Sequence, residues 1–139
     1  MALWAAALSA GVPLGHRVGT LATEHLRRVE DWIDAHLGTP IALGRICSVA
    51  GVGERALQKA FLARHGRSPM RYVAERRVLA AHRHLSRPVD GSGGVTKVAL
   101  SVGFDHLGRF AVLYRQIVGE SPSSTLRKAL GAAAANVLQ

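Results

Sequence analysis

The stretch that decides the fold is residues 46–52, Ile-Cys-Ser-Val-Ala-Gly-Val, because it returns in similar form at residues 98–104 as Val-Ala-Leu-Ser-Val-Gly-Phe. The glycine of each copy lies at 51 and at 103, an offset of 52 residues. Further along, Gly66-Arg67-Ser68-Pro69 returns as Gly119-Glu120-Ser121-Pro122. Each copy predicts a short apolar helix, a glycine turn, a second helix and a stop, which is the outline of a helix-turn-helix.

Apolar spacing and helix-breaking residues place further helices around the two repeats. Leu26, Val29, Ile33 and Leu37 recur at intervals of three and four, which predicts an amphipathic helix. Pro69 opens the longest expected helix, which would connect the repeats. No segment predicts a strand, so the expected fold is all-α, with two helix-turn-helix subdomains and about seven helices. The expected helices cover about 20–37, 42–50, 54–64, 69–86, 95–102, 106–118 and 122–130.

Glycine and proline clusters predict the domain boundaries. Residues 1–19 are apolar and interrupted by glycines, which favours a linker or the remnant of an upstream region of a longer chain over the start of a stand-alone one. The first subdomain is expected at 20–68, the connecting helix at 69–87 and a flexible loop at 88–94. The second subdomain is expected at 95–130, followed by a tail at 131–139.

The charge balance indicates a polyanionic partner. The 139 residues include 18 Lys and Arg against 9 Asp and Glu, a formal net charge of +9. Residues 53–87 hold nine of the basic residues and only two acidic ones. Such a field attracts nucleic acid, and counterion release then supplies affinity that does not depend on base sequence. An acidic membrane surface is less suited, because the charges do not accompany one large apolar helical face.

Several classes of function are disfavoured by what the sequence lacks. Cys47 is the only cysteine, and the seven histidines show no metal-ligand spacing, so we expect no disulfide, metal or cofactor. No nucleophile–base pair, acidic dyad or phosphate loop predicts an enzyme. The N-terminus lacks the positive region of a signal peptide, and no run approaches the roughly 20 apolar residues of a membrane span. We therefore expect a cytoplasmic, nucleoid-associated protein without a membrane partner.

Side chains on the second helix of each repeat have the chemistry of base recognition. Arg55, Gln58 and Lys59 share one helix face at i, i+3 and i+4. Arginine and lysine bond guanine and glutamine bonds adenine in the major groove, although an ordinary solvated face would have the same pattern. In the second repeat, His106 and Arg109 are the expected base contacts.

The remaining expected site residues position the protein on the phosphate backbone or shape the turns. Gly51 and Gly103 are expected at turns that need a positive φ, where valine would damage folding. The expected phosphate contacts are Arg71, Arg76, Arg77, Lys97 and Arg115.

The whole pattern resembles the C-terminal DNA-binding domain of the AraC/XylS family of bacterial transcription regulators over about residues 24–130. The motif with most detail is Val102-Gly103-Phe104-x5-Phe110-x3-Tyr114-x4-Gly119-x-Ser121-Pro122. The resemblance implies two helix-turn-helix units joined by one long helix, with recognition helices in successive major grooves of double-stranded DNA. By matching position it implies base reading at Arg55, Gln58, Lys59, Leu107, Gly108, Arg109 and Val112, of which the apolar and glycine members of the second unit depart from the polar residues often found there.

The resemblance also implies an upstream sensor or dimerisation domain. We expect a sequence-specific transcriptional regulator, an activator that contacts RNA polymerase, whose half-sites lie about 10–10.5 base pairs apart. Two alternatives come from other classes. One is a non-specific or architectural nucleic-acid-binding protein, and the other is a protein-interaction module whose turns pack against a partner.

Overall fold

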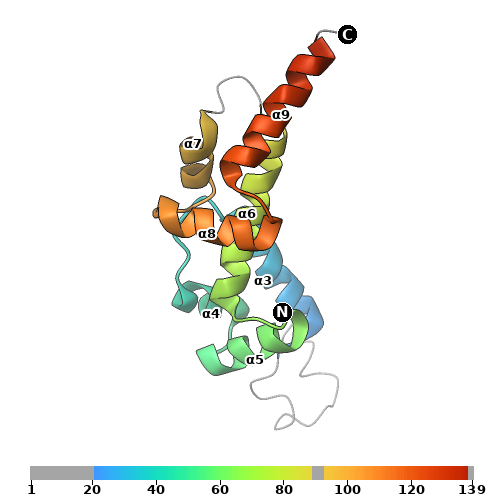
Figure 1. The fold of residues 1–139 in the computed structure, drawn as a ribbon. Helices are drawn as coiled ribbons and strands as arrows, with labels where there is room; N and C mark the ends of the chain where they lie inside the picture. Colours follow the sequence, from blue (N-terminus) through green and yellow to red (C-terminus); the bar gives the residue numbers. More distant parts are fainter. Residues whose placement is uncertain (1–20, 89–92, 138–139) are drawn as a thin grey trace, which may run out of the picture. The chain divides into compact units, whose positions relative to one another are not determined.

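The computed structural model describes residues 21–88 and 93–137, which form seven helices and no strand (Figure 1). The all-α prediction is confirmed. The expected linker at 1–19 and the centre of the expected loop at 88–94 lie outside the described residues. The helices are α3 (Thr23–Ala35), α4 (Leu43–Ala50), α5 (Glu54–His65), α6 (Pro69–Ser86), α7 (Gly94–Ser101), α8 (Leu107–Val118) and α9 (Pro122–Val137).

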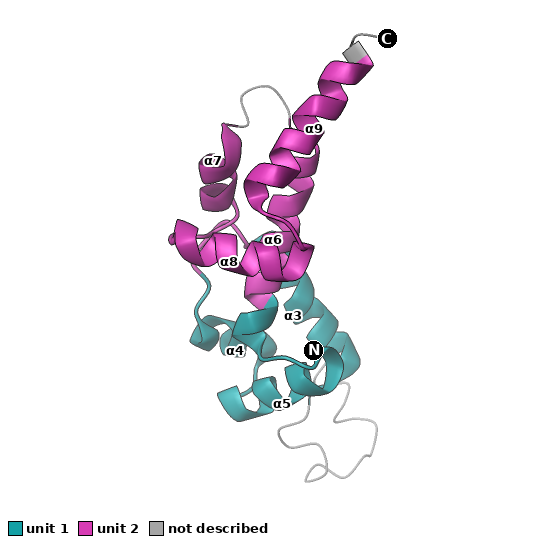
Figure 2. Cartoon of the chain, in the orientation of Figure 1, with its two compact units in different colours: residues 1–36, 41–72 teal, residues 37–40, 73–139 magenta. Residues whose placement is uncertain are grey.

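The chain divides into two compact units, coloured separately in Figure 2. Unit 1 comprises residues 1–36 and 41–72, and unit 2 comprises residues 37–40 and 73–139. Helix α6 therefore begins in unit 1 and continues in unit 2. The short segment 37–40 belongs to unit 2, although in the sequence it lies between two helices of unit 1.

The core of unit 1 is formed by the apolar faces of its helices. The stripe expected on α3 is buried at Leu26, Val29 and Ile33. Ile46 on α4 and Leu57 on α5 have no exposed surface, and the Phe61 ring on α5 lies edge-on to Tyr72 at a centroid separation of 5.3 Å. Each fully buried side chain of this size stabilises the fold by about 1.5–3 kcal/mol relative to exposure. This burial packs α4 and α5 against each other around a shared apolar core.

Unit 2 repeats this arrangement, with larger side chains on its second helix. Val98 and Ala99 of α7 are buried together with Phe110 and Tyr114 of α8. The Phe104 and Phe110 rings lie 4.9 Å apart, and the Phe110 and Tyr114 rings lie 5.5 Å apart. Aromatic pairs at such distances add attraction beyond the area they bury. The two repeats therefore place bulky anchors at equivalent positions of α5 and α8.

The repeated Gly-x-Ser-Pro sequence forms the junction after each second helix. Gly66 and Gly119 end α5 and α8 with φ of 72° and 94°. The serine two residues later accepts a hydrogen bond from a backbone N–H in the first turn of the next helix, at 3.2 Å for Ser68 and 3.1 Å for Ser121. Proline then occupies the first helical position, where its missing N–H costs nothing. The motif is therefore a combined helix stop and start.

The main difference from the expected fold is at the C-terminus. We expected the last helix to end near 130, but α9 continues to Val137. Four consecutive alanines follow Gly131, and alanine has the highest intrinsic helix propensity, so the run continues the helix through the single glycine. Among the described helices, none combines the length and the apolar character that a membrane crossing requires.

Candidate nucleic-acid interface

Both turns are built on a glycine with left-handed backbone geometry. Gly51 has φ 71° and ψ 25°, and its N–H donates to the Cys47 carbonyl at 2.8 Å. Gly103 has φ 98°, and the N–H of Phe104 donates to the Ala99 carbonyl at 3.0 Å. The two positions differ in their surroundings. A β-carbon at 51 would meet open space, whereas one at 103 would meet the Leu37 carbonyl and the Arg77 guanidinium.

A buried carboxylate holds the C-terminal end of α5 to α3. Glu30 lies within the apolar stripe of α3 and accepts hydrogen bonds from Arg64 Nε at 2.6 Å and Nη2 at 3.3 Å. Its Oε2 atom also lies 2.6 Å from His65 Nε2. A carboxylate with so little exposed surface needs such partners, because an unpaired buried charge is strongly destabilising. The contacts fix the inward side of α5.

The opposite face of α5 presents three polar side chains to solvent. Arg55, Gln58 and Lys59 are all exposed, and Arg55 and Lys59 lie one helical turn apart. None of the three forms a hydrogen bond or an ion pair with another described residue. Their donor groups are therefore available to a ligand, in the arrangement that the sequence predicted.

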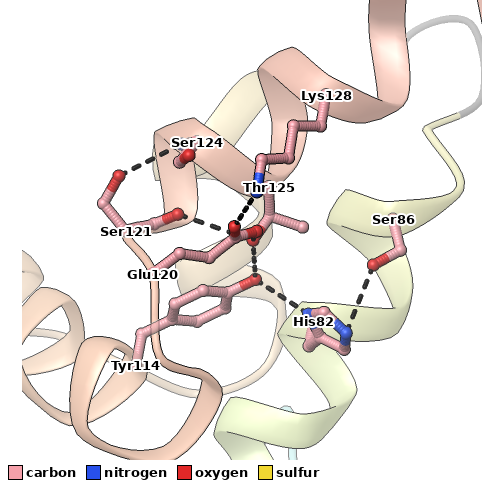
Figure 3. A network of polar contacts seen from close by, with 8 residues as sticks. All are labelled: His82, Ser86, Tyr114, Glu120, Ser121, Ser124, Thr125 and Lys128. Carbon is pink, nitrogen blue, oxygen red and sulfur yellow. Dashed lines mark hydrogen bonds and ion pairs between the residues drawn. The ribbon is translucent and has the colours of Figure 1, made fainter. Parts of the chain in front are cut away.

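A chain of hydrogen bonds holds the inward side of α8 to its neighbours in unit 2 (Figure 3). The Tyr114 hydroxyl donates to Thr125 Oγ1 at 2.7 Å, and Thr125 donates to Glu120 Oε2 at 2.6 Å. Lys128 Nζ contacts the other Glu120 oxygen at 2.6 Å. Because the Tyr114 proton is used on Thr125, His82 Nδ1, 3.0 Å from the phenol oxygen, must act as the donor there.

The ionisation of the network follows from these contacts. Burial raises the pKa of Tyr114, the hydrogen bond to Thr125 opposes this shift, and the Glu120 charge adds to it. The hydrogen bonds from Lys128 and Thr125 lower the pKa of Glu120. At neutral pH the phenol is therefore a neutral donor and the carboxylate is charged, which is the state that the geometry requires.

The solvent face of α8 differs in chemistry from that of α5. His106 is the N-cap residue and Arg109 lies in the first turn of the helix, and both side chains are exposed. Between and beyond them lie Leu107, Gly108 and Val112, of which Leu107 is 43% and Val112 58% exposed. Apolar side chains thus occupy part of the surface where base-reading groups were expected.

The expected phosphate contacts fall into two groups. Arg71, Lys97 and Arg115 are exposed, and Arg76 is half-buried. Arg77 behaves differently, because its Nε donates to the Leu37 carbonyl at 3.1 Å and its Nη2 to the Thr39 carbonyl at 2.8 Å. Burial lowers the pKa of its guanidinium, with Asp105 opposing the shift. Arg77 therefore uses two of its five guanidinium N–H donors within unit 2, and the phosphate contact expected for it stays a prediction.

The polar groups that hold the inward sides of α5 and α8 were not predicted from the sequence. The role of Glu30 could have been predicted from the sequence, because Glu30 lies between Val29 and Ile33 within an apolar stripe and a buried carboxylate needs a partner. The capping roles of Ser68 and Ser121 could also have been predicted, because serine before proline is a frequent helix N-cap. The Tyr114, Thr125 and His82 chain could not, because it joins residues that only the tertiary fold brings together.

Known proteins share both the motifs and the fold. A family model described as a helix-turn-helix domain matches residues 46–128. The probable thc operon regulatory protein of Rhodococcus erythropolis is 38% identical over 102 residues, which are 73% of this chain and 31% of that protein. The XylDLEGF operon transcriptional activator 2 of Pseudomonas putida is 37% identical over 99 residues, 71% of this chain and 63% of that protein. The chain thus spans from about a third to less than two thirds of these curated relatives.

Solved structures extend the comparison to the fold. A probable AraC family transcriptional regulator from Rhodopseudomonas palustris CGA009 has a TM-score of 0.70 and 38% identity, covering 77% of this chain and 98% of that one. The DNA-binding domain of AdpA, solved with a target DNA, has a TM-score of 0.67 and 25% identity, covering 74% of this chain and 90% of that one. From its family match, relatives and fold, the chain belongs to the AraC/XylS family of helix-turn-helix transcriptional regulators.

Proposed function

We propose that this protein binds double-stranded DNA at specific sequences and regulates transcription, with α5 and α8 as its two recognition helices. The observation that supports this most is the exposed set of Arg55, Gln58 and Lys59 on α5, whose inward side is held by the Glu30 contacts. A recognition helix needs both properties, because base readout depends on donors held in a fixed register. The DNA-bound AdpA domain has the same fold.

The backbone contacts proposed around these helices are Arg71, Arg76, Lys97 and Arg115. Such residues neutralise phosphates and set the register without reading sequence. We propose half-sites about one DNA turn, or 10–10.5 base pairs, apart. Relatives named as activators support a role in activation, for which RNA polymerase is the proposed partner. An upstream sensor or dimerisation domain and a location in the cytoplasm on the nucleoid belong to the same proposal.

Selection of random duplex DNA by the purified chain at about 150 mM salt, followed by sequencing, tests the proposal. Two enriched blocks one turn apart are the expected result. Enrichment of no sequence, with tight binding at low salt, would identify a non-specific binder instead. A chain that binds no DNA at all but retains a protein partner at high salt would be an interaction module.

Substitutions at Arg55 separate base reading from charge. Arg55→Ala should weaken the selected site by about 1–3 kcal/mol and relax the preference at one base pair. Arg28→Ala removes the same charge from an exposed position of α3, outside the proposed interface, and should preserve the preference. Arg71→Ala should weaken all sequences alike and reduce the salt slope by about one unit. Equal losses on selected and random DNA for Arg55→Ala would make Arg55 a phosphate contact.

A further inference from the structure

The two recognition helices share a register but differ at the centre of their outward faces. Each has 12 residues, and each buries its fourth and eighth, which are Leu57 and Phe61 in α5 and Phe110 and Tyr114 in α8. Because the helix turns about 100° per residue, the second and sixth residues point away from these anchors. Those positions can therefore be compared directly between the helices.

At these two positions the side chains have opposite chemistry. Helix α5 has Arg55 and Lys59, and α8 has Gly108 and Val112. Val112 is 58% exposed, and the neighbouring Ala111 also lies at the surface. Neither Val112 nor Gly108 has a side chain able to form a hydrogen bond with a base edge. The centre of the α8 face therefore has a different ligand chemistry from that of α5.

Charge on the same helix indicates which ligand this apolar centre meets. Arg109 and Arg115 flank it, both are exposed, and α8 has no acidic residue. A protein partner or a second copy of the chain would match this pattern only with an apolar patch that has acidic side chains on both sides, opposite the two arginines. A DNA groove satisfies both features, since phosphates attract the arginines and thymine presents a methyl group in the major groove.

We propose that α8 reads thymine through its C5-methyl group, with Val112 as the main contact and Leu107 as a second, so that the two halves of the binding site are recognised by different chemistry. This inference rests on the proposed DNA-binding function. Gly108, which has no side chain, permits close approach of the helix to the groove. The first half of the site is read by donors from α5, and in the second half contact with methyl groups is added to the base contacts proposed for His106 and Arg109.

Replacement of thymine by uracil tests this directly, because it removes the methyl group and leaves every base-pairing atom. In the selected duplex, single thymines of the second block are replaced by uracil and binding is measured by fluorescence anisotropy. At a contacted position, affinity should fall about fourfold, which corresponds to the loss of about 0.8 kcal/mol from the burial of one methyl group. Uracil in flanking DNA outside both blocks is the control and should change nothing.

Variants at position 112 assign the effect to the side chain. At the thymine that Val112 contacts, Val112→Ala should bind thymine and uracil duplexes equally, whereas Val112→Thr keeps one methyl group in the same place and should keep part of the preference. Both changes are at an exposed position, so an unchanged melting temperature checks that folding is intact.

The outcomes separate this inference from the proposed function. Two selected blocks with no thymine preference in the second, or a second block in which Val112→Ala changes the preference at no thymine, would overturn the inference and leave specific DNA binding in place. Enrichment of the first block alone would have the same meaning. Failure to select any sequence would overturn both, because α8 would then read no base.

Discussion

A methyl group added at Gly103 should destabilise the protein far more than the same methyl group at Gly51. The sequence treats these turn glycines as equivalents, and both adopt a positive φ. Placing an L-residue in the left-handed region costs about 1–2 kcal/mol, and this is the whole cost at Gly51, where a β-carbon meets nothing. At Gly103 the β-carbon would also meet the Leu37 carbonyl and would lie 2.7 Å from Arg77 Nε.

The additional cost at Gly103 follows from the contacts that must then move. Relief of the overlap displaces the Arg77 guanidinium, which donates to two carbonyls. Each hydrogen bond from a charged donor contributes about 1.5–3 kcal/mol. With the backbone strain included, Gly103→Ala should therefore lower the free energy of unfolding by at least about 4 kcal/mol, a large part of the 5–15 kcal/mol typical of a native domain.

Urea unfolding followed by far-ultraviolet circular dichroism measures both variants on one scale. Combination with Arg77→Ala adds a specific check. The double variant should lose less than the sum of the single losses, because both changes remove the same two hydrogen bonds. Equal destabilisation at 51 and 103, or strict additivity with Arg77→Ala, would refute the role given to this close approach.

Two further predictions concern ionisable groups. Lys128 and Thr125 lower the pKa of Glu120 in the folded state, so its stabilising contribution is complete above its unfolded pKa of about 4.3 and is lost as pH falls through the folded value. In Glu120→Gln the free energy of unfolding in urea should therefore depend less steeply on pH below about 5. An unchanged pH dependence in this range would contradict the prediction. Burial, with a smaller contribution from Glu54, raises the pKa of the Cys47 thiol, so alkylation of Cys47 at about pH 8 should be slower than that of a free thiol. Alkylation should be faster in Glu54→Gln than in the unchanged protein, and equal rates in these two proteins would exclude the Glu54 effect.

Local signals accounted for most of the fold. The stripe on α3, the turn glycines and the Gly-x-Ser-Pro junctions all act within a few residues, where spacing and capping rules apply. The last helix was underestimated because Gly131 was taken as its end, although the alanines that follow have enough helix propensity to continue it.

The sequence predicted which side chains of the site are exposed, but it predicted less well whether each one contacts DNA, solvent or the protein itself. A basic residue on a helix has the same sequence signature whether it meets solvent, phosphate or its own fold. Arg76 and Arg77 are adjacent, yet only the structure shows that Arg77 donates to carbonyls 40 and 38 residues earlier in the chain. Long-range partners of this kind have no local pattern, and the same holds for the contact between His82 and Tyr114.

The placement of segment 37–40 in unit 2 has a consequence for anyone who exchanges parts between regulators of this type. A graft of residues 20–68 from a relative would appear to replace one reading head, but it would also replace the carbonyls that Arg77 binds. A graft limited to 41–72 would leave that loop with its native partners. During synthesis the loop also leaves the ribosome well before Gly103, against which it packs, so unit 2 completes its folding only after both repeats have been made.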